Sequence, residues 1–303
     1  MKKIFFLLLI LIILLLSSCR RETAIDTPVT VPTSANKPEE KPLVLSCIPI
    51  ESELKLIEGW QLLADYITDQ TGIPIEIDTK KSYEEIINGL KNGEVDMAYL
   101  GALSYIEAHE IAGVIPLVQP NFITEKAPTY RSCIIVRKDS GIKNFTGLKG
   151  KKFAFTDKDS TSGYLIPVSM MADSGIKNLN FFSSYLFTGD HEAAFLAVYN
   201  GYVDGGAVYS RLFLDNKDPR LKDIIIIKKS EPIPTGPIVI RKEIPSEKIK
   251  LIKKAYLSVG GKKETEELRK LIKTSHYCET SDKDYDVIRK ATEIFKKMGL
   301  DKK

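Results

Sequence analysis

Segments typical of strands and segments typical of helices alternate along this chain from about residue 43 to its end. Short apolar runs mark strands, and apolar residues spaced three and four apart mark helices. We expect strands at 43–50, 73–77, 95–100, 115–118, 130–136, 152–156, 181–187, 203–209, 224–227 and 238–240. We expect helices at 54–67, 82–90, 103–112, from 160 onward, and at 191–200, 246–258, 264–273 and 284–298. This alternation predicts an α/β fold with a largely parallel sheet.

The alternating pattern runs through the chain twice. Asn92-Gly93-Glu94-Val95-Asp96 ends one helix and begins a strand, and Asn200-Gly201-Tyr202-Val203-Asp204 does the same later. Such turns also recur by chance, so the echo is weak evidence of a duplication. We expect two α/β lobes, 43–130 plus 235–303 and 131–234, which the chain crosses near 127–135 and 229–237. Two such lobes place the carboxyl ends of their strands, where α/β sheets bind ligands, around one cleft.

The N-terminus predicts export from the cytoplasm. Lys2 and Lys3 precede an apolar run from Ile4 to Leu16, thirteen residues, whereas a membrane span needs about 20. A basic start, an apolar centre and a small-residue site predict a signal peptide over 1–18. Leu16-Ser17-Ser18-Cys19 also looks like a bacterial lipobox, in which Cys19 is lipidated and becomes the mature N-terminus; the alternative is a plain signal peptide with a chance cysteine.

Residues 19–42 are predicted to be a flexible tether between the lipid and the folded part. Residues 20–42 contain no aromatic side chain and four prolines, so they cannot bury enough apolar surface to offset the entropy of ordering. The expected location is therefore the cell envelope, outside the cytoplasm, in the periplasm or on the outer face of the cytoplasmic membrane. The sequence leaves open which membrane carries the anchor.

Charge and cysteine content narrow the function classes. Without Lys2 and Lys3, 42 of the 44 basic residues remain against 40 acidic ones, and no dense basic stripe occurs, which argues against nucleic acid as the partner. Besides Cys19 there are three cysteines, Cys47, Cys133 and Cys278, and the sequence does not decide whether two of them pair. The three histidines are far apart and no CxxC occurs, so we expect neither a metal site nor a cofactor.

The segment from Asp159 to Pro167 follows a predicted strand and opens an apolar helix. It contains Ser160, Thr161 and Ser162 in succession, then Gly163. A helix N-terminus carries unpaired N–H groups and partial positive charge, so hydroxyl donors there suit a tetrahedral oxyanion. The alternative is an ordinary helix cap, because serine and threonine are preferred at that position anyway.

With these features the chain resembles the substrate-binding lipoproteins of phosphate/phosphite/phosphonate ABC importers. The resemblance covers about residues 43 to 242 and rests on an ordered set of motifs: Asn92 to Gly101, Tyr130 to Ser140, Leu148 to Lys151, Ser160 to Tyr164 with Pro167, Gly189 to Ala194, Gly201 to Asp204, and Pro234 to Val239. The family resemblance implies the two-lobed type 2 periplasmic-binding-protein fold. It also implies the permease subunits of an ABC importer as partners, and we expect a monomer.

The resemblance also implies a ligand site. Ser160, Thr161 and Ser162 would hold the phosphonate oxygens, and His191 at the next helix start would contact the same group. Tyr99 and Tyr130 match positions that line the cleft, although core packing is the alternative for both. Asp159 and Asp204 complete the candidate ligand-binding residues.

Two departures from the family pattern narrow the ligand. Relatives that bind aminoalkyl phosphonates use acidic groups for the amine, at positions that here correspond to Gly236 and, on an ungapped match, Arg211. A buried ammonium without a carboxylate is unfavourable, so an aminophosphonate is disfavoured. Asp159 stands where relatives carry a neutral residue, and could accept a proton from a hydrogen phosphate or merely cap the helix. We expect phosphate, phosphite or a small neutral-tailed phosphonate.

Three other functions fit part of the pattern. Ser162, His191 and Asp204 have the residue types of a hydrolase triad, but no G-x-S-x-G elbow occurs. A receptor that presents its ligand to a sensor kinase or chemoreceptor would have the same sequence features as an import receptor. The same fold could also bind another anion, such as a sulfonate, or an organic cofactor precursor. We expect a binding protein rather than an enzyme.

Overall fold

The computed structural model describes residues 41–49, 53–78, 82–123, 125–213 and 218–299. The predicted signal peptide, the predicted lipidation at Cys19 and the tether up to residue 40 lie outside the described residues. The described residues all belong to one unit, residues 40–303. A helix with the length and apolar character needed to cross a bilayer does not occur in them.

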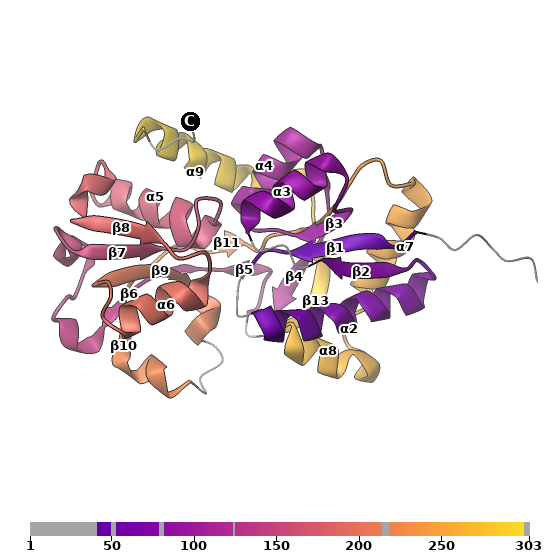
Figure 1. Cartoon of the computed structure of the whole chain (residues 1–303), viewed down its shortest axis with the longest axis horizontal. Coiled ribbons are helices and arrows are strands. Elements are labelled where there is room, and N and C mark those ends of the chain that lie inside the picture. The colour runs from indigo at the N-terminus through magenta and orange to yellow at the C-terminus, as the bar shows by residue number, and fades with distance from the viewer. Residues whose placement is uncertain (1–40, 50–52, 79–81, 124, 214–217, 300–303) are drawn as a thin grey trace, which may run out of the picture. The chain divides into compact units, whose positions relative to one another are not determined.

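The first sheet has six strands in the order β13-β4-β12-β3-β1-β2 (Figure 1). Their bounds are β1 (Leu43–Cys47), β2 (Ile75–Asp78), β3 (Met97–Tyr99), β4 (Ile115–Phe122), β12 (Ile238–Ile240) and β13 (Thr274–Glu279). β1 runs parallel to β2 and β3, whereas β12 is antiparallel to β3 and β4, and β13 is antiparallel to β4. Leu45 and Ala98 are fully buried, so this part of the sheet lies in the core.

The second sheet has five strands in the order β10-β6-β9-β7-β8. They are β6 (Ser132–Arg137), β7 (Lys152–Phe155), β8 (Ser184–Phe187), β9 (Gly205–Tyr209) and β10 (Ile224–Lys229). β7 is parallel to β8 and β9, and β6 is antiparallel to β9 and β10. The prediction of a largely parallel sheet is therefore wrong, because both sheets are mixed. β6 and β12 enter their sheets directly from the other half of the chain, without the helical crossover that joins parallel neighbours.

A short two-stranded ribbon joins the segments between the sheets. β5 (Thr129–Tyr130) pairs antiparallel with β11 (Ile233–Pro234), with Ile233 opposite Tyr130. Next to the ribbon, the buried Thr235 hydroxyl donates hydrogen bonds to the carbonyls of Pro120, at 2.8 Å, and Pro128, at 3.1 Å. The two crossings expected near 127–135 and 229–237 thus lie side by side and are hydrogen-bonded to each other.

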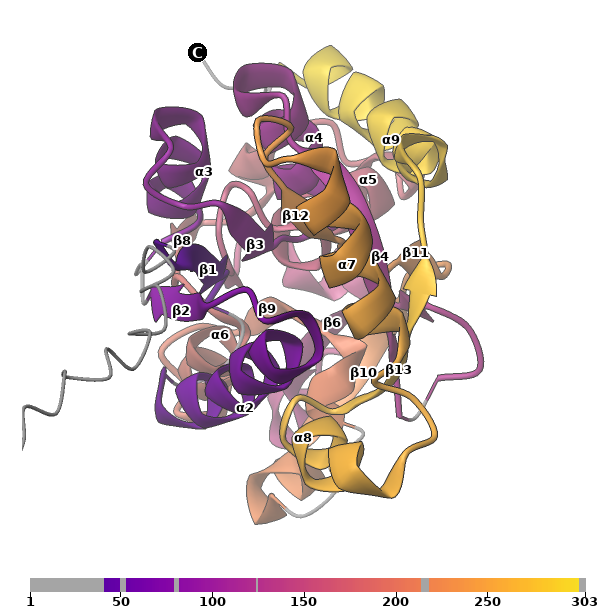
Figure 2. The ribbon, with the colours of Figure 1, turned by 90° about the vertical axis from the view of Figure 1, so that its right-hand side faces the viewer.

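Helices flank both sheets. They are α2 (Glu53–Thr71), α3 (Tyr83–Asn92), α4 (Ala102–Ala112), α5 (Ile166–Asp173), α6 (His191–Tyr199), α7 (Ser246–Leu257), α8 (Glu266–Leu271) and α9 (Asp286–Lys297). α2 contacts α7 and α8 (Figure 2). α9 contacts both α4 and α5, and the Phe295 ring meets the Tyr164 ring with centroids 5.1 Å apart. The C-terminal helix therefore touches elements associated with each sheet.

Local signals explain most helix bounds. The hydroxyl of Ser82 accepts a hydrogen bond from the Glu85 N–H at 3.1 Å and so caps α3, as its sequence predicts. Gly93 ends α3 at φ 75°, the left-handed conformation that glycine adopts without strain. The polar strand β13 has no counterpart among the predicted strands, because Thr274-Ser275-His276-Tyr277-Cys278-Glu279 lacks an apolar run.

Candidate functional site

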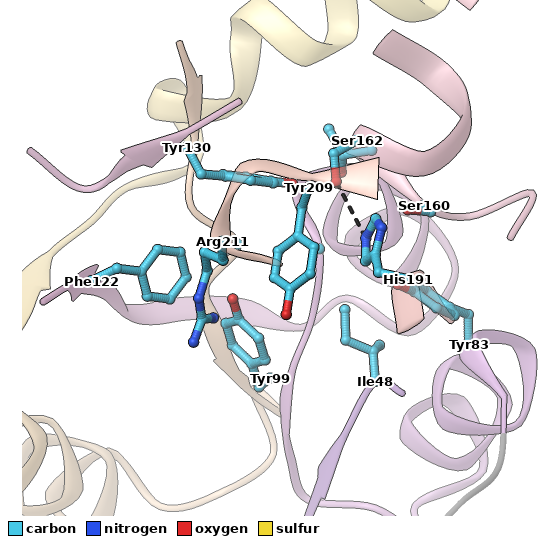
Figure 3. Close-up of a pocket in the computed structure, with 13 residues that line it drawn as sticks. Ile48, Tyr83, Tyr99, Phe122, Tyr130, Ser160, Ser162, His191, Tyr209 and Arg211 are labelled. Atoms are coloured by element: carbon cyan, nitrogen blue, oxygen red, sulfur yellow. Dashed lines mark hydrogen bonds between the residues drawn. The ribbon is translucent and has the colours of Figure 1, made fainter. Parts of the chain in front are cut away.

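A small pocket collects residues from elements of both sheets (Figure 3). Its cavity volume of about 30 Å³ corresponds to roughly two or three water molecules. Among the described residues the lining consists of one isoleucine, aromatic side chains, hydroxyls, two glycines, one histidine and one arginine: Ile48, Tyr83, Tyr99, Gly101, Phe122, Tyr130, Ser160, Thr161, Ser162, His191, Tyr209, Arg211 and Gly236. A ligand of this pocket must therefore be small.

Four helical segments begin at or directly after residues that line the pocket. Tyr83 is the first residue of α3, Gly101 precedes α4, and His191 is the first residue of α6. Ser160 precedes a π-helical turn, Thr161–Leu165, that continues into α5, and its hydroxyl accepts a hydrogen bond from the Gly163 N–H at 3.0 Å. Helix N-termini expose N–H groups and carry partial positive charge, so their convergence favours an anion in the pocket.

The three hydroxyl residues are buried, with at most 2% of each residue exposed. Ser160 does cap its helix, so the cap interpretation holds for that residue. The Thr161 Oγ1 accepts a hydrogen bond from the Leu103 N–H in the first turn of α4 at 2.8 Å. The Ser162 carbonyl is held by the Ser132 hydroxyl at 2.7 Å, which leaves the Ser162 hydroxyl near His191. The segment that caps the helix therefore also lines the pocket. Thr161 connects this segment to α4, which flanks the first sheet.

His191 is fixed from three sides. Its Nδ1 lies 3.1 Å from Thr156 Oγ1, its Nε2 lies 3.4 Å from Ser162 Oγ, and its ring stacks on Tyr209 with centroids 4.4 Å apart. Burial lowers the pKa of His191 to about 3, and the charge of Arg211 acts in the same direction. The imidazole is therefore neutral at pH 7.

Arg211 is a buried cation at the pocket. It lies in a 3₁₀ turn, Ser210–Phe213, directly after β9, and 5% of the residue is exposed. Its guanidinium carbon lies 3.7 Å from the centre of the Phe122 ring, and Nη2 donates to the Ile272 carbonyl at 3.4 Å. No ion pair of Arg211 occurs within the part of the chain that the structure describes. The sequence marked this position only as a departure from the family, not as a lining residue.

Tyr99 and Tyr130 line the pocket and are also part of the core. The Tyr99 ring packs against Trp60 with centroids 5.5 Å apart, and burial raises its pKa. Burial also raises the pKa of Tyr130, while hydrogen bonds with Ser162 and Thr161 act in the opposite direction. The two alternatives that the sequence offered for these tyrosines are therefore both realised, and the Tyr130 hydroxyl lies beside the hydroxyl cluster.

The two candidate aspartates do not line the pocket. Asp204 Oδ2 accepts a hydrogen bond from the Lys152 N–H at 2.8 Å, at the start of β7, whereas the pocket lies at the other end of the neighbouring strand, where Tyr209 lines it. Asp159 is buried, and its N–H donates to Asp157 Oδ1 at 2.8 Å. His191 Nδ1 faces Thr156 rather than Asp204, so the structure does not assemble the hydrolase triad.

Several lining residues were not anticipated. Ile48, Tyr83, Phe122 and Tyr209 sit where strands end or helices begin, but the sequence gives them only core or capping signals. No disulfide joins any two of the three described cysteines, Cys47, Cys133 and Cys278. No cluster of metal-ligating side chains occurs among the described residues.

The fold is that of a two-lobed periplasmic binding protein of type 2. A binding-protein component of an ABC phosphonate transporter from Pseudomonas aeruginosa superimposes with a TM-score of 0.79, at 25% identity over 86% of this chain and 88% of that one. The family model described as the periplasmic substrate-binding protein of phosphonate ABC transporters matches residues 45–285. The chain belongs to this family.

Two curated relatives support the assignment. The phosphate-import protein PhnD of Mycolicibacterium smegmatis is 26% identical over 83% of this chain and 85% of its own length. The phosphonates-binding periplasmic protein of Escherichia coli is 29% identical over 86% of this chain and 78% of its own length. As a member of the family, the chain is a substrate-binding component of an ABC transport system outside the cytoplasm, with a small ligand and permease subunits as partners.

Proposed function

We propose that this protein is a lipid-anchored receptor that captures a phosphorus oxyanion in the pocket and delivers it to an ABC importer. The ligand is phosphate, phosphite or a small phosphonate. The observation that carries the proposal is the convergence of four helix starts on a pocket whose lining, among the described residues, contains a buried arginine and no carboxylate. These described groups stabilise a negative charge rather than a positive one.

The neutral histidine indicates which protonation state the pocket accepts. The Thr156 hydroxyl has one proton, which it donates to the Ala207 carbonyl at 3.3 Å. We therefore assign the Nδ1 proton of His191 as the donor to Thr156, which leaves Nε2 as an acceptor on the Ser162 side. A monoprotonated oxyanion can donate to this acceptor, whereas sulfate cannot. The pocket should therefore discriminate against sulfate, with His191 rather than Asp159 as the acceptor of the ligand proton.

Thr161 takes part both in binding the ligand and in closing the two lobes. Thr161 Oγ1 accepts from the Leu103 N–H at the start of α4, so its hydroxyl proton, which lies beside the Tyr130 hydroxyl, is what it can donate to a ligand oxygen. The β5–β11 ribbon provides the hinge about which the lobes, 43–130 plus 235–303 and 131–234, move. A ligand that contacts both lobes only when they are closed shifts the population to the closed form, which the permease would recognise.

The membrane attachment rests on the sequence alone. Leu16-Ser17-Ser18-Cys19 is the proposed processing site, with Cys19 carrying the acyl chains. Replacing Cys19 with Ala should move the exported protein from the membrane fraction to the soluble fraction and abolish its labelling with a fatty-acid analogue. A variant that remains in the membrane fraction without label would contradict the lipid anchor.

The function is tested by isothermal titration of the purified protein, residues 20–303, with phosphate, phosphite, methylphosphonate, 2-aminoethylphosphonate and sulfate. We expect one-to-one binding of at least one of phosphate, phosphite and methylphosphonate. We expect no binding of 2-aminoethylphosphonate or sulfate. Ser162→Ala should weaken that binding about tenfold or more, because it removes a hydrogen bond to a charged group. Ser169→Ala is the matched control, since Ser169 lies in α5 and its hydroxyl bonds to the Leu165 carbonyl. Binding of an unrelated organic molecule alone would overturn the proposal.

A further inference from the structure

We propose that the preferred ligand carries a second acidic group, a carboxylate one or two bonds from phosphorus, and that Arg211 binds it. The substrate class is thus a short carboxylated phosphonate rather than an alkyl or aminoalkyl phosphonate. This inference rests on the function proposed above and replaces the neutral tail expected from the sequence. The lining of the pocket supplies the observations that carry it.

The first observation is that Arg211 lacks a counter-charge. A buried guanidinium without a paired anion is unfavourable, because the interior does not replace the water that solvates it in the unfolded chain. Within the described part of the chain, neither an aspartate nor a glutamate pairs with Arg211, and none lines the pocket. A second anionic group on the ligand would supply the missing charge.

The second observation concerns hydrogen bonds. A guanidinium has five N–H donors, and among the described residues Arg211 donates one hydrogen bond, the long contact of Nη2 with the Ile272 carbonyl at 3.4 Å. The Phe122 ring covers one face of the guanidinium at 3.7 Å and the Tyr209 ring lies 5.7 Å away, so its orientation is restricted. A planar guanidinium held in this way suits a carboxylate, which it can bind through two parallel hydrogen bonds.

The third observation is the position of Arg211 in the pocket. Ser162 and His191 lie on one side of the Tyr209 ring, and Arg211 lies on the other, next to Phe122 and Tyr99 (Figure 3). The tetrahedral head of the ligand would occupy the side with the hydroxyls, so Arg211 is left for its substituent. Since the cavity measures only about 30 Å³, the substituent must be short.

The pocket also disfavours a ligand whose tail carries a positive charge. An ammonium tail would meet Arg211 and no carboxylate of the described lining. A side chain at position 236 cannot supply one either, because a Cβ there would lie 1.8 Å from the Leu100 carbonyl oxygen. A neutral tail is sterically acceptable but leaves the guanidinium unpaired. Of the three tail types, the acidic one alone pairs with this residue.

The experiment compares phosphonoacetate, propylphosphonate and 2-aminoethylphosphonate by competition titration against methylphosphonate on the purified protein. We expect phosphonoacetate to bind at least tenfold more tightly than propylphosphonate, which is similar in size, and 2-aminoethylphosphonate to bind most weakly. Arg211→Met should weaken the binding of phosphonoacetate much more than that of methylphosphonate and so abolish the preference for phosphonoacetate over propylphosphonate. Arg137→Met, at an exposed arginine paired with Asp139, is the control and should change none of these affinities.

Three outcomes would overturn the inference. Equal affinities for phosphonoacetate and propylphosphonate in the original protein would do so without any variant, which matters if Arg211→Met fails to fold. An equal loss for all ligands in Arg211→Met would assign Arg211 to the tetrahedral head or to lobe closure. Failure of methylphosphonate, phosphate and phosphite to bind at all would instead contradict the proposed function itself.

Discussion

The pocket has a first side, formed by the first sheet and its helices, and a second side, formed by the second sheet. The two sides differ in chemistry. The second sheet supplies the polar and charged groups, which are the three hydroxyl residues, His191 and Arg211. The first sheet and its helices supply mainly shape, with Ile48, Tyr99 and Phe122 as apolar surfaces and Gly101 and Gly236 as points of close approach. The second side thus carries the groups that suit an anion, and the first side mainly encloses the pocket. Substitutions on the two sides should therefore have different effects on stability and on ligand affinity.

The largest effect is expected at Gly236, on the first side. A Cβ at this position would lie 1.8 Å from the carbonyl oxygen of Leu100 and 2.8 Å from the Cα of Gly101, so the backbone itself must move. Gly236→Ala should therefore lower the melting temperature by several degrees and abolish ligand binding. Thermal unfolding and titration with methylphosphonate measure the two effects.

Gly101→Ala is the matched control on the same side of the pocket. Its Cβ would meet Ser104 Oγ and Thr161 Oγ1 at 3.4 Å, which is close to an ordinary contact. This variant should fold with a melting temperature near that of the original protein. If Gly236→Ala behaves as mildly as Gly101→Ala, the close approach of the two backbone segments is not required.

The second prediction concerns His191, on the second side of the pocket, and the stability of the protein in acid. The pKa of His191 is about 3 in the folded protein and 6.5 for an ordinary histidine, so the unfolded chain binds the proton first as the pH falls. The stabilising contribution is complete above pH 6.5 and is lost progressively toward pH 3, by up to about 1.4 kcal/mol per pH unit. His191→Gln removes this loss, so its free energy of unfolding should fall less steeply between pH 6 and pH 4.

Urea unfolding at several pH values measures this slope. His276→Gln is the control, because His276 is exposed on β13 and its removal leaves the buried imidazole in place. Equal slopes for the original protein and His191→Gln would show that His191 is not held neutral. Bound methylphosphonate should reduce the slope of the original protein, since an anion beside the imidazole favours its protonated form.

The third prediction tests the residue that connects the two sides. Thr161→Val keeps the shape of the side chain but removes the acceptor of the Leu103 N–H and a donor to the ligand. The binding free energy should weaken by roughly 1–3 kcal/mol, the range for a lost hydrogen bond to a charged group. Thr146→Val, in an exposed turn, should leave the affinity unchanged. Titration of both variants with the same ligand decides whether Thr161 belongs to the site.

The sequence predicted the second side of the pocket better than the first. Ser160, Thr161, Ser162 and His191 stand where a strand ends and a helix begins, and this local pattern fixes both their conformation and the end of the sheet at which they lie. Phe122 and Ile48 carry no such signal, because their place in the pocket depends on how the chain returns from the other sheet. The strand at 238–240 was predicted, but the antiparallel direction of β12 was not, for the same reason. β13 was missed because its sequence lacks an apolar run.

Arg211 illustrates the limit of a local pattern. The sequence identified the position by its charge, but the 3₁₀ turn that aims the side chain at Phe122 follows β9 without any periodic signal. Asp204 shows the converse, because its place beside a motif suggested a ligand role. Its carboxylate instead accepts from the Lys152 N–H, at the end of the strands away from the pocket.

The smallest effects are expected from the two tyrosines, and they sharpen the comparison. The Tyr130 hydroxyl lies beside Ser162 and Thr161, whereas Tyr99 packs by its ring against Trp60 on the first side. Tyr130→Phe should therefore weaken binding by roughly 0.5–1.5 kcal/mol, the range for a neutral hydrogen bond, and Tyr99→Phe by less. Titration with methylphosphonate measures both. A larger loss for Tyr99→Phe would mean that the first sheet contributes a hydrogen bond to the anion, and the contrast between a polar side and a shaping side of the pocket would have to be abandoned.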